Sequence, residues 1–287
     1  MSPLLELRDL RLAIGGQVIL RGVHLDVHAG QVAGLVGESG AGKSMVGRVI
    51  LRLQPEDAHI DRGEVSFEGR DLLWMSEREH GTLLGREIAL IPQNPMTALN
   101  PVARIEPQMT DVLRMHLGMD RDAALARALE LLHDVQIREP EQVLRRYPHE
   151  LSGGMRQRVL IAIAFACRPK LIIADEPTTA LDVTVQKQVL RLLKRLQEVH
   201  GTAILFITHD LGVVAKLCDT VSVIHAGRIV ESGTTAQVFR APGHPYTRAL
   251  LAATPRYDRP GDALQPIPGA LTEQLWGEAR ALDAGAR

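Results

Sequence analysis

The sequence predicts an α/β fold in three parts: an N-terminal antiparallel β region, a core of buried strands that alternate with helices, and a helical insertion within that core. Apolar and polar residues alternate between residues 5 and 27, which is typical of half-exposed strands. Further along, short apolar runs of four to six residues recur, and helical patterns separate them. Such runs are typical of buried parallel strands.

The core elements follow from these patterns. We expect buried strands at 32–36, 88–91, 171–174 and 203–208, and a hairpin formed by 221–224 and 228–231. We expect helices at 43–53, 155–167 and 185–199, the last with an apolar face that reaches Val199. Gly201 ends this last helix, and Pro92 ends the strand at 88–91.

The insertion and the tail are read in the same way. A capping box from Ser76 to Glu79 predicts a short helix. Helical patterns dominate residues 94–147, and Leu125, Leu129 and Leu132 mark one amphipathic helix there. After Thr254 the chain becomes rich in Pro and Gly, which predicts a loosely ordered tail.

Composition excludes several classes of protein. Lys and Arg number 33 against 34 Asp and Glu, and aromatic residues make up 3%, which argues against a nucleic-acid binder. The two cysteines, Cys167 and Cys218, are too few for a disulfide scaffold, a structural zinc or an iron–sulfur cluster. We expect reduced thiols in the cytosol. The N-terminus does not resemble a secretory signal, and the longest apolar run, 159–167, is too short to span a membrane.

A glycine-rich segment joins the strand at 32–36 to the following helix. It fits the pattern G-x-x-x-x-G-K-[ST] with Gly37, Glu38, Ser39, Gly40, Ala41, Gly42, Lys43 and Ser44. Its backbone N–H groups and the helix N-terminus suit phosphate oxygens. Lys43 would reach the β- and γ-phosphates and Ser44 would bind Mg²⁺; the alternative is an ordinary glycine-rich turn.

Two carboxylates end the strand at 171–174. Asp175 suits the Mg²⁺ of a phosphate-loop site, and Glu176 suits the base that activates water. The alternative is a solvated strand end before Pro177.

A second glycine-rich segment opens the helix near residue 155. It contains Ser152, Gly153, Gly154 and Gln157. Serine and glycine at a helix N-terminus form another anion-binding corner. The alternative is a simple capped helix start.

These motifs together resemble the nucleotide-binding subunit of an ABC transporter. LSGGMRQR resembles the signature motif of that family, GESGAGKS its Walker A loop and LIIADE its Walker B strand. Gln93 resembles the Q-loop glutamine, Asp182 lies in the D-loop, and His209 resembles the switch histidine. The resemblance covers residues 4–254, with a helical subdomain at about 94–155 and a tail at 255–287. It implies a P-loop NTPase (RecA-like) core.

The resemblance implies a mechanism and partners. ATP would be hydrolysed to ADP and phosphate with Mg²⁺ held by Ser44, Asp175 and Gln93. Glu176 would be the base, and Gln93 and His209 would sense the γ-phosphate. The signature residues would act on ATP bound to a second cassette, either a copy or a different subunit. Two membrane permeases and an extracytoplasmic binding protein would complete an importer, with this chain at the cytoplasmic face of the inner membrane.

A finer resemblance indicates the importer group for dipeptides, oligopeptides and nickel. It rests on the segments 93–101, 147–150, 175–186 and 244–251. Peptides are the expected cargo, and nickel or another small solute is the alternative. The ABC family often places an aromatic residue near the end of the first strand to stack on adenine; Ile14 lies there in this chain, so adenine stacking is in doubt. The tail has no cysteine after Cys218, so we expect no iron–sulfur cluster.

Two other functions are possible on the sequence alone. A soluble ABC ATPase acting on ribosomes or DNA usually carries two cassettes or a long insertion, and this chain has one P-loop and a short insertion. A P-loop nucleotide kinase would have no need of the LSGG segment or of His209.

Overall fold

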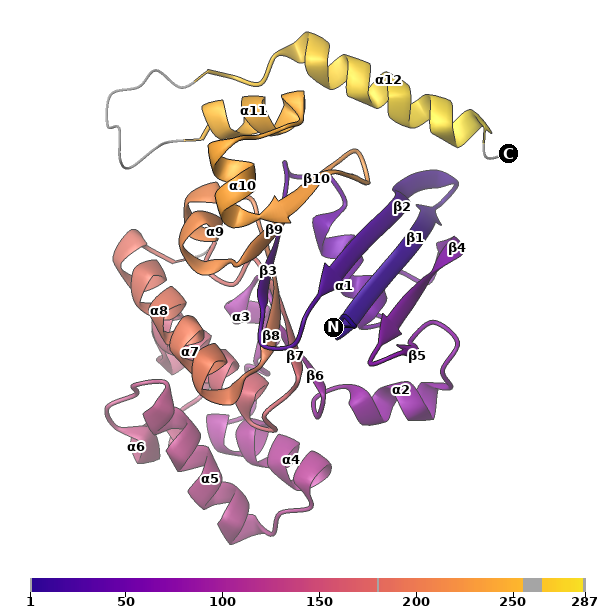
Figure 1. Cartoon of the computed structure of the whole chain (residues 1–287). Helices are drawn as coiled ribbons and strands as arrows, with labels where there is room; N and C mark the ends of the chain where they lie inside the picture. The colour runs from indigo at the N-terminus through magenta and orange to yellow at the C-terminus, as the bar shows by residue number, and fades with distance from the viewer. Residues whose placement is uncertain (1, 180, 255–264, 286–287) are drawn as a thin grey trace. The chain divides into compact units, whose positions relative to one another are not determined.

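The computed structural model describes residues 2–179, 181–254 and 265–285 (Figure 1). The chain divides into two compact units. Unit 1 comprises Met1–Met75 and Leu205–Arg287, and unit 2 comprises Ser76–Ile204. Strand β8, Ala203–Thr208, is where the chain passes from unit 2 back into unit 1, and its bounds are those predicted.

Unit 1 begins with an antiparallel sheet of four strands in the order β2-β1-β4-β5. The strands are β1 (Leu5–Ile14), β2 (Gln17–Val27), β4 (Ala58–Phe67) and β5 (Arg70–Asp71). Leu12 pairs with Leu20, and Arg11 pairs with Arg21. Since neighbouring residues of a strand point to opposite faces, the leucine pair and the arginine pair lie on opposite faces. The predicted antiparallel region is confirmed.

The core strands of unit 1 support the glycine-rich loop. Strand β3 (Val32–Val36) is fully buried and pairs in parallel with β9 (Thr220–His225). Strand β10 (Arg228–Thr234) forms the predicted hairpin with β9. Helix α1 runs over Lys43–Ile50, three residues shorter than predicted. Arg52 has a φ of 52°, a left-handed conformation that a helix cannot contain.

The C-terminal part of unit 1 is helical. It contains α9 (Leu211–Leu217), α10 (Thr235–Arg240), α11 (Pro245–Ala252) and α12 (Gly269–Gly285). The prediction of a loosely ordered tail is wrong for α12, which is drawn in yellow in Figure 1. The carboxylate of Asp283 lies 2.9 Å from Arg21 and 3.4 Å from Arg11, and Ala279 is buried. These contacts hold the tail helix on β1 and β2. Residues 255–264 lie outside the described residues.

Unit 2 carries the second part of the core. Strands β6 (Ile88–Ile91) and β7 (Leu171–Asp175) pair in parallel. Helix α2 (Glu77–Leu83) has the predicted capping box. Helix α8 (Val183–His200) ends at Gly201 as predicted, but Val199 is 71% exposed and does not belong to the buried face. Helix α7 (Gly153–Phe165) begins two residues earlier than predicted because Ser152 caps it.

The insertion in unit 2 is helical, as predicted. It consists of α3 (Pro95–Ala98), α4 (Ile105–Leu117), α5 (Arg121–Asp134), α6 (Pro140–Arg145) and the 3₁₀ turn η1 (Pro148–Glu150). The buried face of α5 differs from the predicted face of Leu125, Leu129 and Leu132. Ala124 and Ala128 are fully buried, and Leu125 and Leu129 are only partly covered. Small side chains there let α5 approach its neighbours closely. Within the described ranges, no helix has the length and apolar character that crossing a bilayer requires.

Candidate functional site

The glycine-rich loop lies between β3 and α1 in unit 1. Gly40 and Gly42 have φ values of 80° and 103°, which L side chains rarely adopt. Gly42 is the N-cap of α1, and no side chain among the described residues caps this helix. The loop therefore presents a helix N-terminus of the kind that binds phosphate groups.

Lys43 is the only charged side chain at the start of α1. It is 5% exposed, and its Nζ donates to the carbonyl oxygens of Gly37 and Glu38, each at 2.9 Å. The ammonium group is thus held over the loop by the loop's own backbone. A phosphate placed in the loop would offer this cation a charged acceptor, which makes a stronger hydrogen bond than a neutral carbonyl.

Three contacts from distant segments of unit 1 fix the loop. The N–H of Gly227 donates to the carbonyl of Ala41 at 3.0 Å. A Cβ atom at Gly37 would lie 2.2 Å from the carbonyl oxygen of Ile224, so only glycine fits there. The hydroxyl of Tyr246 donates to Glu38 at 3.0 Å. These three contacts could not be predicted from the sequence, since the hairpin and the 244–251 segment carry no local sign of contact with the loop.

The carboxylates predicted for metal binding and catalysis lie in unit 2. Asp175 is the last residue of β7, and Glu176 follows it with a φ of 44°, a strained conformation for a residue with a side chain. Glu176 Oε2 accepts from Gln93 Nε2 at 3.1 Å and from Thr179 Oγ1 at 2.9 Å. The structure thus brings two predicted residues, Gln93 and Glu176, into direct contact. Thr179 is a further partner that the motif alone did not single out.

The signature segment forms the start of α7. Ser152 is the N-cap, and its Oγ accepts from the N–H of Met155 at 3.3 Å. Gly153 and Gly154 form the first turn, and a Cβ at Gly154 would lie 2.8 Å from Val185 of α8. Gln157 is 0% exposed, and its amide atoms make no hydrogen bond within the part of the chain that the structure describes. Its side chain therefore faces the interior and not a neighbouring chain.

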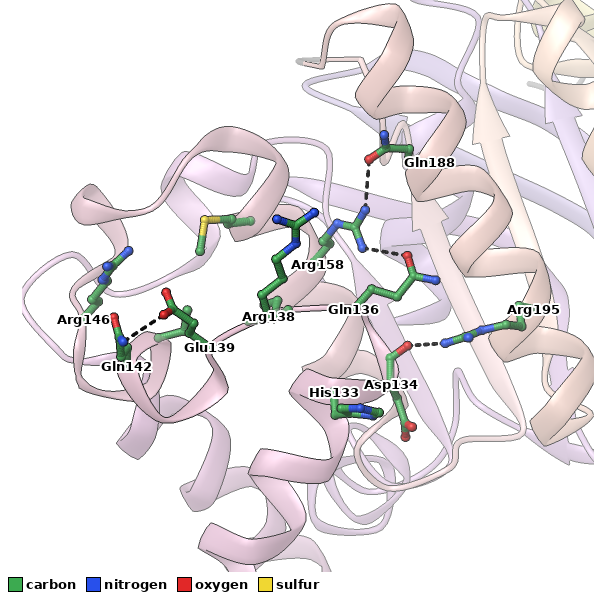
Figure 2. A pocket seen from close by; sticks show the side chains of 13 residues that line it. His133, Asp134, Gln136, Arg138, Glu139, Gln142, Arg146, Arg158, Gln188 and Arg195 are labelled. Atoms are coloured by element: carbon green, nitrogen blue, oxygen red, sulfur yellow. Dashed lines mark hydrogen bonds between the residues drawn. The ribbon is translucent and has the colours of Figure 1, made fainter.

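Arg158 joins the signature helix to its neighbours in unit 2. Figure 2 shows its guanidinium between Gln136 and Gln188 of α8. It also donates to the carbonyl of Val135 at 2.7 Å. Burial lowers the pKa of Arg158. These bonds border a cavity of about 1140 Å³, and they fix the signature helix against both the insertion and α8.

Asp182 and His209 each stand next to a helix start. Asp182 is the N-cap of α8, and its carboxylate accepts from the N–H groups of Thr184 and Val185 at 3.0 and 2.9 Å. His209 follows β8 in unit 1, directly before Asp210, which caps α9. Both residues therefore lie in turns at the ends of core elements, as the motifs predict.

The predicted metal ligands have suitable chemistry. Ser44, Asp175 and Gln93 offer a hydroxyl, a carboxylate and an amide oxygen, the hard oxygen donors that Mg²⁺ prefers. Ser44 belongs to unit 1, and the other two belong to unit 2. No group of three or more His, Cys, Asp or Glu residues is placed to hold a metal ion among the described residues.

The fold and these motifs define a P-loop ATPase of the cassette type. Solved structures agree with this class. A dimeric ATP-binding cassette in a post-hydrolysis state, bound to ADP and Pi, has a TM-score of 0.71 and 26% identity, over 80% of this chain and 98% of that one. An ATP-binding subunit of an ABC transporter has a TM-score of 0.68 and 29% identity, over 83% of this chain and 92% of that one.

Family models and curated relatives give the family. The model described as ABC transporter matches residues 20–179, and that described as oligopeptide/dipeptide transporter, C-terminal region, matches residues 230–278. The probable D,D-dipeptide transport ATP-binding protein of Escherichia coli K12 is 50% identical over 94% of this chain and 84% of its own length. The oligopeptide transport ATP-binding protein of Bacillus subtilis 168 is 49% identical over 98% and 81%. The chain belongs to the ABC transporter family and is an ATPase.

Proposed function

We propose that this chain is the ATP-hydrolysing subunit of an importer for dipeptides and oligopeptides. The observation that carries the proposal is the match of residues 230–278 to the C-terminal region of oligopeptide/dipeptide transporters. The relatives named for dipeptide and oligopeptide transport support it, since they are about half identical over almost the whole chain. Nickel or another small solute is the alternative cargo.

The proposed organisation follows the motifs. Residues 4–254 form the ATPase domain, the helical subdomain occupies about 94–155, and 255–287 form a tail. The chain would pair with a second ATPase subunit, identical or different. It would lie against two permeases at the cytoplasmic face of the plasma membrane, with an extracytoplasmic binding protein that supplies the cargo. We propose no role for nucleic acid and no iron–sulfur cluster.

The proposed chemistry begins with phosphate binding. Residues 37–44 would enclose the phosphates of ATP, and Lys43 would exchange its carbonyl acceptors for the β- and γ-phosphate oxygens. Positive charge at that point would stabilise the negative charge that develops on the transferred phosphoryl group. Mg²⁺, held by Ser44, Asp175 and Gln93, would supply charge neutralisation at the phosphate oxygens.

Glu176 would then activate the water that attacks the γ-phosphorus. Its Oε2 already accepts two hydrogen bonds, from Gln93 and Thr179, which orient the carboxylate. A water hydrogen-bonded to this carboxylate would give up a proton to it as the bond to phosphorus forms and the bond to the β-phosphate oxygen breaks. His209 would bind the γ-phosphate, and Ser152, Gly153 and Gly154 would bind it from the second subunit.

The Glu176→Gln variant tests this proposal. We expect ATP binding to remain within about twofold and turnover to fall by about 10²–10⁴-fold, the usual contribution of general-base catalysis. The matched control is Glu198→Gln on α8, whose carboxylate is exposed and, among the described residues, forms an ion pair with Lys194 at 3.7 Å. Full turnover in Glu176→Gln would refute the assigned base.

The same variant tests the biological setting. Tagged Glu176→Gln protein, trapped with ATP in native membranes, should co-purify with two permeases and a second ATPase subunit. The associated binding protein should then bind peptides in preference to Ni²⁺. Preference for Ni²⁺ would refute peptides as the cargo and favour the nickel alternative. Recovery with ribosomes or DNA-bound proteins in place of permeases would refute the transport function.

A further inference from the structure

The C-terminal part of unit 1 reaches the phosphate-binding loop through a buried tyrosine. Tyr246, in the first turn of α11, is 0% exposed, and its hydroxyl donates to Glu38 Oε2 at 3.0 Å. The two residues are 208 positions apart in the sequence. Glu38 is the second residue of the loop, so α11 contacts the loop directly.

The hydrogen bond from Tyr246 to Glu38 joins a hydroxyl donor to a carboxylate acceptor. Burial and the neighbouring Glu38 carboxylate raise the pKa of Tyr246 well above its ordinary value, so the hydroxyl stays a donor at any physiological pH. A hydroxyl that donates to a carboxylate makes a charge-assisted bond. The Glu38 side chain is 45% exposed, so without this partner it would turn toward water.

Aromatic side chains hold the tyrosine in place. The centre of the His225 ring lies 4.3 Å from that of the Tyr246 ring, and Trp276 of α12 meets the His225 ring edge-on, with 6.0 Å between the ring centres. His225 Nδ1 is 3.9 Å from Glu38 Oε2. Burial, opposed by Glu38, lowers the pKa of His225, so the ring is neutral at pH 7 and acts by packing. Helix α12 thus reaches the tyrosine through His225.

Glu38 links this cluster to the lysine that binds phosphate. The Glu38 carbonyl accepts from Lys43 Nζ at 2.9 Å and from the N–H of Ala41 at 3.2 Å. The side chain of Glu38 therefore anchors the same residue whose backbone holds Lys43 and closes the loop. Rotation of that residue would move the acceptors of Lys43.

We propose that Tyr246 is a positioning residue for ATP, because its hydroxyl holds Glu38 and thereby keeps the phosphate-binding loop in the conformation that receives the phosphates. This inference rests on the assignment of residues 37–44 as the ATP site. It gives the C-terminal region of the chain a role in ATP binding. A preformed loop binds its ligand without the cost of ordering it, so loss of the bond should weaken binding.

The test is the Tyr246→Phe variant of the full chain, which removes one hydroxyl and keeps the buried ring. We expect the dissociation constant for Mg·ATP, measured by calorimetry, to rise about five- to tenfold, which is somewhat less than the full loss of a hydrogen bond to a charged group would give. The turnover number at saturating ATP, in the assembled transporter, should stay within about twofold. The control is Thr254→Val, which removes a hydroxyl that donates, within the part of the chain that the structure describes, to the Leu250 carbonyl.

A double-mutant cycle separates positioning from packing. In a Glu38→Ala background, Tyr246→Phe should have no further effect on ATP binding, since the acceptor is already gone. Glu38→Gln, which keeps an acceptor oxygen, should bind ATP more tightly than Glu38→Ala even if Tyr246→Phe fails to fold. Wild-type affinity in Tyr246→Phe, equal effects in both backgrounds, or equal affinities of the two Glu38 variants would each overturn the inference. If the wild-type chain itself neither binds nor hydrolyses ATP, the proposed function fails instead.

Discussion

The chain has two glycine-rich helix starts that are both assigned to phosphate, and they are built differently. At α1 the N-cap is Gly42 in a left-handed conformation, and no side chain of the described residues caps the helix. At α7 the N-cap is Ser152, which satisfies the N–H of Met155 with its own hydroxyl. The first start therefore depends on a ligand or on contacts from distant segments, whereas the second satisfies one of its free N–H groups with its own side chain.

The difference bears on how each segment functions. The loop before α1 is held by contacts with Gly227 and Tyr246, which come from the other end of the sequence. The start of α7 is held by its own serine and by Arg158, which joins it to Val135 and Gln188 (Figure 2). A loop that is preformed for its own nucleotide needs contacts from other segments of the chain to hold it. The start of α7 carries a cap of its own, which would suit a segment proposed to meet the nucleotide of another subunit.

Lys43→Ala should produce the largest effect. It removes the ammonium group at the start of α1, so the charge stabilisation proposed for the transferring phosphoryl group would be lost. We expect ATPase activity to fall by about 10²–10³-fold, as for the loss of one transition-state donor. Lys187→Ala, at an exposed position of α8, is the matched control. Retention of a tenth or more of the wild-type rate would show that the loop works without its lysine.

Ser152→Ala should have a smaller effect, on stability. Loss of the cap leaves the N–H of Met155 without its side-chain acceptor and should lower the free energy of unfolding by about 1 kcal/mol. Ser39→Ala in the glycine-rich loop is the control, because Ser39 is exposed and the N-cap of α1 is Gly42; we expect a change within about 0.5 kcal/mol. Urea unfolding measures both. Equal losses for the two variants would contradict the distinction between a self-capped and a braced start.

The sequence predicted the buried strands better than the contacts between distant segments that hold the loop and the tail helix. Strands β3, β6 and β8 begin and end at the predicted residues, because apolar runs and Pro92 are local signals. The contact between Gln93 and Glu176 agrees with two motif residues that were assigned to one site.

The contacts that hold the loop and the tail helix join residues that are far apart in the sequence. Helix α12 is held by the ion pair of Asp283 with Arg21, 262 positions away. Nothing near Asp283 indicates that partner, and so the tail was wrongly expected to be loosely ordered. Tyr246 lies in the segment 244–251, which indicates the importer group from the sequence, and its contact with Glu38 depends on the tertiary fold.

The two helix starts can be compared directly by changing one glycine to alanine in each segment. Gly40 has a φ of 80° with open space around its Cα, so Gly40→Ala should cost about 1 kcal/mol through backbone strain alone. Gly153 lies in the first turn of α7, and a Cβ there would be 3.9 Å from Leu181, an ordinary contact. Gly153→Ala should therefore raise the free energy of unfolding by about 0.5 kcal/mol, since alanine loses less entropy on entering a helix.

The two variants should also separate stability from function. If the Gly153 backbone approaches the phosphates of the second subunit's ATP, the methyl group of Gly153→Ala should lower ATPase activity in the assembled transporter while the isolated chain becomes more stable. Urea unfolding and ATPase assays on the same preparations measure both quantities. A stability loss at Gly153 as large as that at Gly40 would mean that the start of α7 is as strained as the loop, and the distinction between the two segments would fail.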